Sequence, residues 1–194
     1  VKQIMLVNVM FYKKKIFLIL LVLFFNSKTL ASVKENIIQN LKDINNVSFN
    51  FEQNINGKIE NGSCIIEYPK KIYCKYDLSN QKILVSNGQS LVIKTTSGFY
   101  QYPISKTPLN FILNKEFLLK KINNLDERIV DEKFINFNFI ENDNEINIFF
   151  DKKTHNLIGW QTLDIYQNLS ITYLNSIIKN QKIKKSIFEL PGRN

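Results

Sequence analysis

Alternation of apolar and polar residues between Val47 and Tyr76 constrains the fold more than any other feature of this sequence. Val47, Phe49 and Phe51 are separated by polar residues, and the same alternation returns between Ile72 and Tyr76. A period of two is typical of a β-strand with one buried face and one face in water. The stretch therefore predicts the first strands of a curved antiparallel sheet.

The only two cysteines, Cys64 and Cys74, lie within these predicted strands. If Tyr68-Pro69-Lys70 forms the loop of a hairpin, Glu67 faces Lys71 and Cys64 faces Cys74. Opposed cysteines on neighbouring strands form a disulfide where their separation and side-chain directions allow it. We therefore predict a disulfide here, and the alternative is a pair of small buried thiols.

The first 31 residues have the pattern of a secretory signal. Three lysines at positions 13–15 precede an apolar run from Ile16 to Phe25, and Ala31 is a small residue at a suitable cleavage position. The run is short for a membrane span. We predict a cleaved signal peptide at 1–31 and a single domain at 32–194, with an uncleaved membrane anchor as the alternative.

Charge does not favour nucleic acid as a partner. The full chain has a formal net charge of +9, but the predicted signal holds five of its lysines and no acidic residue, so residues 32–194 carry +4. The remaining basic residues are scattered, whereas a nucleic-acid-binding surface gathers them on one face.

Helices are predicted at two places. Val33, Ile37 and Leu41 recur at helical spacing, which predicts an amphipathic helix that ends near Asn45. Thr107-Pro108 is a favourable helix start, and the apolar residues that follow as far as Ile122 predict one or two short helices.

Almost all of the remaining sequence is strand-like. Gly57 and Gly62 are expected to mark a hairpin, and Asn87-Gly88 to mark another turn. Ten or eleven strands follow from these patterns, if a last short run ending at Phe188 is included. So many strands in one small domain must form a curved sheet.

Residues for catalysis are sparse. The single histidine, His155, lies in a lysine-rich turn and is expected to be solvated, which leaves a zinc site or a Ser-His-Asp triad without its ligands. Glu52, Glu60 and Glu67 are expected on a solvated strand face. We predict no enzyme activity, no metal and no cofactor; a secreted hydrolase that uses carboxylates is the alternative from another class.

Several short motifs occur in an order that resembles the LolA family of periplasmic outer-membrane lipoprotein carriers. The motifs are Phe51-Glu52-Gln53, Gly57 and Gly62, Tyr68-Pro69 with Tyr76, Val85-Ser86-Asn87-Gly88, Tyr102-Pro103-Ile104, Thr107-Pro108-Leu109, Phe150-Asp151, Trp160, Asp164 and Phe188-Glu189-Leu190-Pro191. Each is weak alone, but together they cover essentially all of residues 32–194.

The resemblance implies a mainly β fold with a helical lid: an incomplete, strongly curved antiparallel β-barrel around a hydrophobic cavity covered by short helices. It implies a periplasmic chaperone that carries lipoproteins from the inner-membrane LolCDE transporter to an outer-membrane acceptor such as LolB, without a cofactor. We also expect a monomer. The alternative is a lipid- or lipoprotein-binding or sensing module on the same scaffold.

Candidate acyl-chain contacts are the inward-facing residues of such a barrel. By alternation on the strands and by position in the lid they are Phe49, Phe51, Ile66, Ile72, Tyr76, Leu91, Ile93, Phe111 and Ile112. Each of them could equally be a core residue with no ligand contact.

Lid and gating positions also follow from the resemblance, namely Tyr68, Leu109 and Leu113. Loading would displace the helix around 109–113. Many family members have a basic residue, often Arg, directly before the proline of the Tyr68-Pro69 motif. Because Tyr68 stands there, the part proposed for that Arg in holding the lid and taking up cargo does not transfer to this chain.

Overall fold

The computed structural model describes residues 32–78, 80–164 and 167–193, so the predicted signal peptide at 1–31 lies outside the described residues. The chain divides into two units, Val1–Ser32 and Val33–Asn194, and the fold belongs to the second. Within the described residues no helix is long and apolar enough to cross a membrane.

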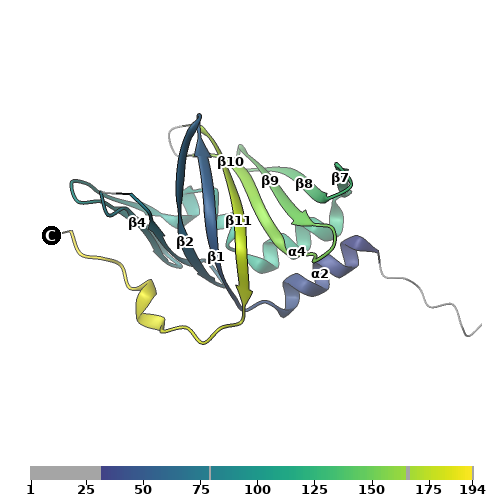
Figure 1. Ribbon diagram of the computed structural model, residues 1–194, viewed down its shortest axis with the longest axis horizontal. Coiled ribbons are helices and arrows are strands. Elements are labelled where there is room, and N and C mark those ends of the chain that lie inside the picture. The colour runs from purple at the N-terminus through teal and green to yellow at the C-terminus, as the bar shows by residue number, and fades with distance from the viewer. Residues whose placement is uncertain (1–31, 79, 165–166, 194) are drawn as a thin grey trace, which may run out of the picture. The chain divides into compact units, whose positions relative to one another are not determined.

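Eleven strands of the described chain form one antiparallel sheet in the order β6-β5-β4-β3-β2-β1-β11-β10-β9-β8-β7 (Figure 1). They are β1 Asn46–Ile55, β2 Lys58–Glu67, β3 Lys71–Tyr76, β4 Ile83–Asn87, β5 Ser90–Lys94, β6 Phe99–Pro103, β7 Arg128–Val130, β8 Phe134–Glu141, β9 Asn144–Asp151, β10 Leu157–Leu163 and β11 Leu169–Lys179.

The sheet consists of two meanders joined where β1 pairs with β11. Strands β6 and β7 lie at its two ends, and no pairing between them is found among the described residues. The sheet is therefore curved but not closed, which confirms the predicted incomplete barrel.

Helices connect the two ends of the sheet. The chain passes from β6 through a 3₁₀ turn, η1 Ile104–Lys106, then α3 Leu109–Ile112 and α4 Lys115–Asn124, to β7. Asn114 caps α4 by accepting a hydrogen bond from the Phe117 amide. The N-terminal helix α2, Val33–Asp43, lies beside α4 (Figure 1), so the predicted helices are present.

The hydrophobic core lies between the helices and the face of the sheet that we call the inner face. Strand alternation puts Phe49, Phe51 and Ile66 on that face, and helix periodicity brings Ile37 and Leu118 onto it from the other side. Burial of these large apolar side chains is the main stabilising contribution to the fold.

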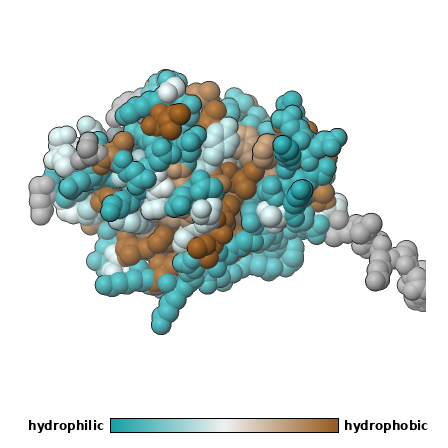
Figure 2. Space-filling model, viewed as in Figure 1, coloured by the Kyte–Doolittle hydropathy of each residue, from teal (hydrophilic) through white to brown (hydrophobic). Residues whose placement is uncertain are grey.

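The outer face of β3 and β4 carries the C-terminal segment. The final run, predicted as a strand, is instead a 3₁₀ turn, η2 Lys185–Phe188, which packs against β3 and β4. Phe188 is buried and the Lys71 ammonium lies 5.8 Å from its ring centre. Elsewhere on the outer face Ile59, Tyr173 and Ile178 are exposed, and Figure 2 shows hydrophobic patches there interrupted by hydrophilic residues.

The β2–β3 hairpin has the predicted register: Glu67 pairs with Lys71 and Cys64 with Cys74. The two cysteines are joined by a disulfide with their Cα atoms 4.1 Å apart. The sequence predicts that Gly62 marks a turn, but Gly62 lies inside β2. The turn before β2 is formed at Asn56-Gly57, where both residues have positive φ.

Candidate functional site

A cavity of about 330 Å³ lies between the inner face of the sheet and the segment that follows η1. Apolar residues from both meanders and from this segment form most of its lining: Ile55, Leu84, Leu91, Ile93, Tyr100, Tyr102, Pro108, Leu109, Trp160 and Leu163. Ligand cavities span about 300–1,000 Å³, so this one has room for a small apolar ligand.

The residues predicted to contact acyl chains separate into two groups. Tyr76, Leu91, Ile93 and the lid residue Leu109 line the cavity. The others are packed in the closed core: Phe49, Phe51, Ile66, Ile72, Phe111, Ile112 and the lid residue Leu113. The second group reaches a ligand only if the helices move away from the sheet.

Aromatic contacts connect the core group to the cavity. Phe49 packs edge-on against Trp160, with ring centres 6.3 Å apart, and Phe51 packs in the same way against Tyr76 at 4.9 Å. Trp160 and Tyr76 both line the cavity. Phe49 and Phe51 therefore hold two lining side chains in place.

Sequence reasoning missed several lining residues. Leu84, Tyr100 and Tyr102 alternate with outer-face residues in β4 and β6, so strand alternation could have identified them. Trp160 appeared only as part of a family motif. Gln53 continues the alternation of Phe49 and Phe51 but is polar, so it was not among the predicted contacts. Lys82 and Ser170 are also polar, and no apolar pattern indicates them.

Glu60 lies on the inner face, which corrects the expectation of a solvated strand face for this residue. It is only 3% exposed. Lys82 and Lys58 donate to its two carboxylate oxygens at 2.5 and 2.9 Å. Burial alone would raise the pKa of Glu60, but these two ammonium groups outweigh it and hold the pKa below its ordinary value of 4.5. Glu52 is exposed, as expected, and Glu67 is partly exposed beside Lys71.

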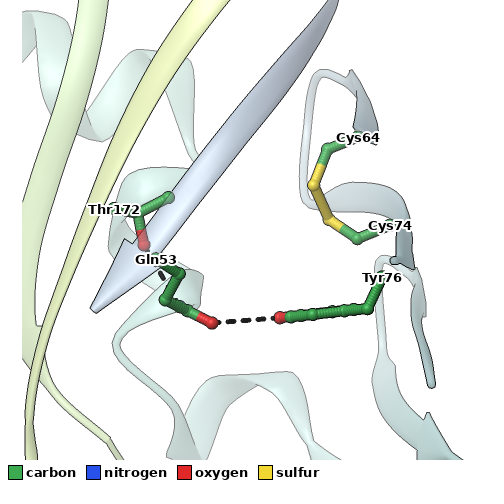
Figure 3. The surroundings of a disulfide bond; sticks show 5 residues. All are labelled: Gln53, Cys64, Cys74, Tyr76 and Thr172. Carbon is green, nitrogen blue, oxygen red and sulfur yellow. Dashed lines mark hydrogen bonds between the residues drawn. A yellow bond between two sulfur atoms is a disulfide. The ribbon is translucent and has the colours of Figure 1, made fainter. Parts of the chain in front are cut away.

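A row of hydrogen-bonded side chains crosses the inner face next to this ion pair (Figure 3). The Tyr76 hydroxyl donates to Gln53 Oε1 at 3.2 Å. The Gln53 amide in turn donates to Ser170 Oγ at 3.2 Å and to Thr172 Oγ1 at 3.1 Å. Burial, and secondarily the negative charge of Glu60, raise the pKa of the Tyr76 hydroxyl, which therefore stays protonated and able to donate.

Comparison with known proteins identifies the family. A family described as "Outer membrane lipoprotein carrier protein LolA" matches residues 42–191. The chain belongs to the LolA family. No curated protein matches the sequence.

Solved structures resemble this LolA family member at low sequence identity. An uncharacterized conserved protein from Thermus thermophilus has a TM-score of 0.49 and 6% identity over 82% of this chain and 93% of its own. A LolA superfamily protein from Nitrosomonas europaea has a TM-score of 0.42 and 8% identity over 82% and 99%. The lipoprotein LppX from Mycobacterium tuberculosis has a TM-score of 0.42 and 10% identity over 78% and 96%.

The contacts around Tyr68 fasten the α3–α4 segment to the β2–β3 loop and to the end of α2. The backbone amide of Lys70 donates to the Leu113 carbonyl at 2.8 Å. Lys115 donates to the carbonyls of Lys42 and Ile44 at 3.1 and 2.8 Å, and its ammonium lies 6.0 Å from the Tyr68 ring centre. At the position where many LolA proteins have a basic side chain, a cation thus approaches from α4 instead.

The sequence predicts a solvated His155, but the structure shows it partly buried. Its backbone carbonyl accepts a hydrogen bond of 2.6 Å from Asn40, which ties the β9–β10 turn to α2. Within the described part of the chain, no three His, Cys, Asp or Glu side chains are grouped so that they could hold a metal ion.

Proposed function

We propose that this LolA family protein is a periplasmic carrier that holds the acyl chains of lipoproteins and moves them from the inner to the outer membrane. The main support for this proposal is the largely apolar cavity between the inner face of the sheet and the segment at 107–109. The family description, a lipoprotein carrier, supports the same assignment.

The energetics of acyl chains explain why such a cavity is needed. Each CH₂ group exposed to water costs about 0.8 kcal/mol, so a lipoprotein with two or three chains has a cost of tens of kcal/mol. A soluble carrier must cover most of that surface and still release it. A ligand that lies beside Leu91, Ile93 and Leu109 would be covered in this way.

Loading is expected to move the helices. The cavity volume of about 330 Å³ is at the lower end for ligand sites, so several chains require more space than the closed structure offers. Displacement of α3 would expose Phe111 and Ile112 together with the aromatic residues of β1 beneath the helices. The predicted acyl-chain contacts in the core would then meet the ligand.

We further propose that residues 1–31 are a cleaved secretory signal. A disulfide between Cys64 and Cys74 suits the oxidising periplasm. The proposed partners are acylated lipoproteins, an inner-membrane transporter of the LolCDE type and an acceptor such as LolB. We propose no catalytic activity.

Native mass spectrometry with a synthetic diacylglyceryl-cysteine lipopeptide tests the carrier function. We expect a one-to-one complex with the lipopeptide and none with the same peptide lacking the lipid. Ile93→Trp fills the cavity and should weaken binding about tenfold, since excess volume in a packed site costs roughly 1–3 kcal/mol.

Ile59→Trp is the matched control, because Ile59 is exposed on the outer face of β2 and the added volume meets only solvent. Equal binding of the lipidated and unlipidated peptides would contradict the proposal, as would equal weakening in both variants. Protein purified from the periplasm with free lipid but without lipoprotein would support the lipid-binding alternative.

A further inference from the structure

Part of the cavity lining is polar, although most of the lining is apolar. This polar wall consists of Gln53, Tyr76, Lys82 and Ser170, from β1, β3, the loop before β4 and β11. These side chains share the lining with the apolar residues Leu84, Leu91, Ile93 and Leu109. A container for hydrocarbon alone would have no use for polar groups, whose burial is costly.

The hydrogen-bond directions leave a donor at this wall. Ser170 Oγ accepts its bond from the Gln53 amide, so the Ser170 hydroxyl proton is not used in that bond. Thr172 Oγ1 also accepts from Gln53, but Thr172 does not line the cavity. Gln53 is held from the other side by the Tyr76 hydroxyl (Figure 3), which fixes the geometry of the row.

The charge of the wall selects the kind of acceptor. Lys82 pairs with the buried carboxylate of Glu60 at 2.5 Å, and its ammonium lies 4.0 Å from the centre of the Tyr76 ring. Lys58, which is not part of the lining, contacts the other oxygen of Glu60. Asp164 adds a further carboxylate to the lining. The wall thus offers hydrogen-bond donors without a surplus positive charge, which favours neutral carbonyl oxygens over a phosphate group.

We propose that the polar wall is a subsite for the ester carbonyls that join acyl chains to glycerol, with Ser170 as a donor and the chains directed towards Leu91 and Ile93. This rests on the proposed function and makes it more specific. The subsite orients the cargo, because only one end of a diacylglyceryl group carries carbonyl oxygens.

Two lipopeptides that differ only in their linkage test the subsite. One carries two ester-linked acyl chains and the other carries two ether-linked alkyl chains of the same length, so only the first has carbonyl acceptors. We expect the protein without its predicted signal peptide to bind the ester form about fivefold to tenfold more tightly. This difference in affinity corresponds to the free energy of one or two hydrogen bonds.

Ser170→Ala should remove most of this preference by weakening only the ester form, about fivefold. Thr172→Val is the matched control, since it removes a hydroxyl bonded to the same Gln53 but outside the cavity, and it should keep the preference. Equal loss of preference in both variants would overturn the assignment to Ser170.

Further outcomes separate the subsite from the carrier function. Equal binding of ester and ether lipopeptides by the unaltered protein would overturn the subsite and leave the carrier function in place. Absence of binding to either would overturn the carrier function itself. Phosphatidylglycerol with the same acyl chains distinguishes the source of the esters, and tighter binding of this phospholipid than of the lipopeptide would overturn the inferred preference for an uncharged group.

Discussion

Gly62 shows how closely the inner face is packed at the level of a single residue. A Cβ atom added to Gly62 would lie 2.2 Å from the Lys75 carbonyl oxygen and 2.8 Å from the Phe51 ring. Phe51 in turn contacts Tyr76, which lines the cavity. We therefore expect Gly62→Ala to lower the free energy of unfolding by about 1–3 kcal/mol, measured by urea denaturation.

Gly98→Ala is the control for this substitution. A Cβ atom added to Gly98 would lie 3.0 Å from the exposed Tyr100 ring and 3.2 Å from Thr95 Oγ1, and both are side-chain atoms that can shift. A loss of stability in Gly98→Ala as large as in Gly62→Ala would show that the close approach at Gly62 is not the cause.

Glu60 makes stability depend on pH. Because the pKa of Glu60 is lower in the folded protein than its ordinary value of 4.5, the carboxylate stabilises the fold fully above that pH. The contribution is lost as the pH falls through the lower, folded-state pKa. We expect Glu60→Gln to cost about 2 kcal/mol of unfolding free energy at neutral pH and much less in acid.

Denaturation curves at several pH values for the unaltered protein and for Glu60→Gln measure this difference. Glu52→Gln removes the same charge from an exposed position of β1 and should have a small effect at every pH. A cost of Glu60→Gln that stays constant into acid would rule out the ion pairs with Lys58 and Lys82 as its origin.

These residue-level features were the hardest to predict from sequence. Alternation places Glu60 on one of two faces, but the expectation of a solvated carboxylate rested on residue type. Lys82, which makes burial of Glu60 tolerable, is brought beside it by the pairing of β2, β3 and β4. Glycine is typical of turns, so the sequence predicts a turn at Gly62, whereas the actual reason for a glycine there is the nearby Lys75 carbonyl, which only the structure reveals.

Single elements were more predictable, because hairpin register follows from loop length and strand alternation. The pairing of Cys64 with Cys74 followed from a short loop at Tyr68-Pro69-Lys70. The segment before Phe188 was predicted as a strand and is a 3₁₀ turn. Its residues pack on the outer face of β3 and β4, and this tertiary contact outweighs local β-propensity.

The disulfide gives a test of the β2–β3 hairpin. Cys64 and Cys74 are ten residues apart, and closing a loop of that length stabilises a protein by about 2–3 kcal/mol. We expect dithiothreitol to lower the unfolding free energy of the unaltered protein by that amount. The variant with serine at both positions should not respond to the reductant, and an equal response in the two proteins would contradict the prediction.

For the whole molecule, the boundary between cavity and core depends on the position of the helices. Alternation correctly placed Phe49, Phe51, Ile66 and Ile72 on the inner face. It could not show that the helices cover them while Leu91 and Ile93 remain at a cavity. That distinction arises from the long connection between β6 and β7, whose path is set by packing across the sheet.

Loading should loosen this connection and leave the sheet intact. The helix α3 has only four residues, far fewer than the roughly 12–15 at which an isolated helix becomes even marginally stable, and a hydrogen bond from Lys70 to Leu113 fastens its end. We expect the lipopeptide to accelerate amide hydrogen exchange at 109–113, whereas β1 and β11 keep their protection through their shared ladder. The unlipidated peptide should change neither region. Unchanged exchange at 109–113 in a protein saturated with lipopeptide would show that the cavity accepts its cargo without displacement of α3.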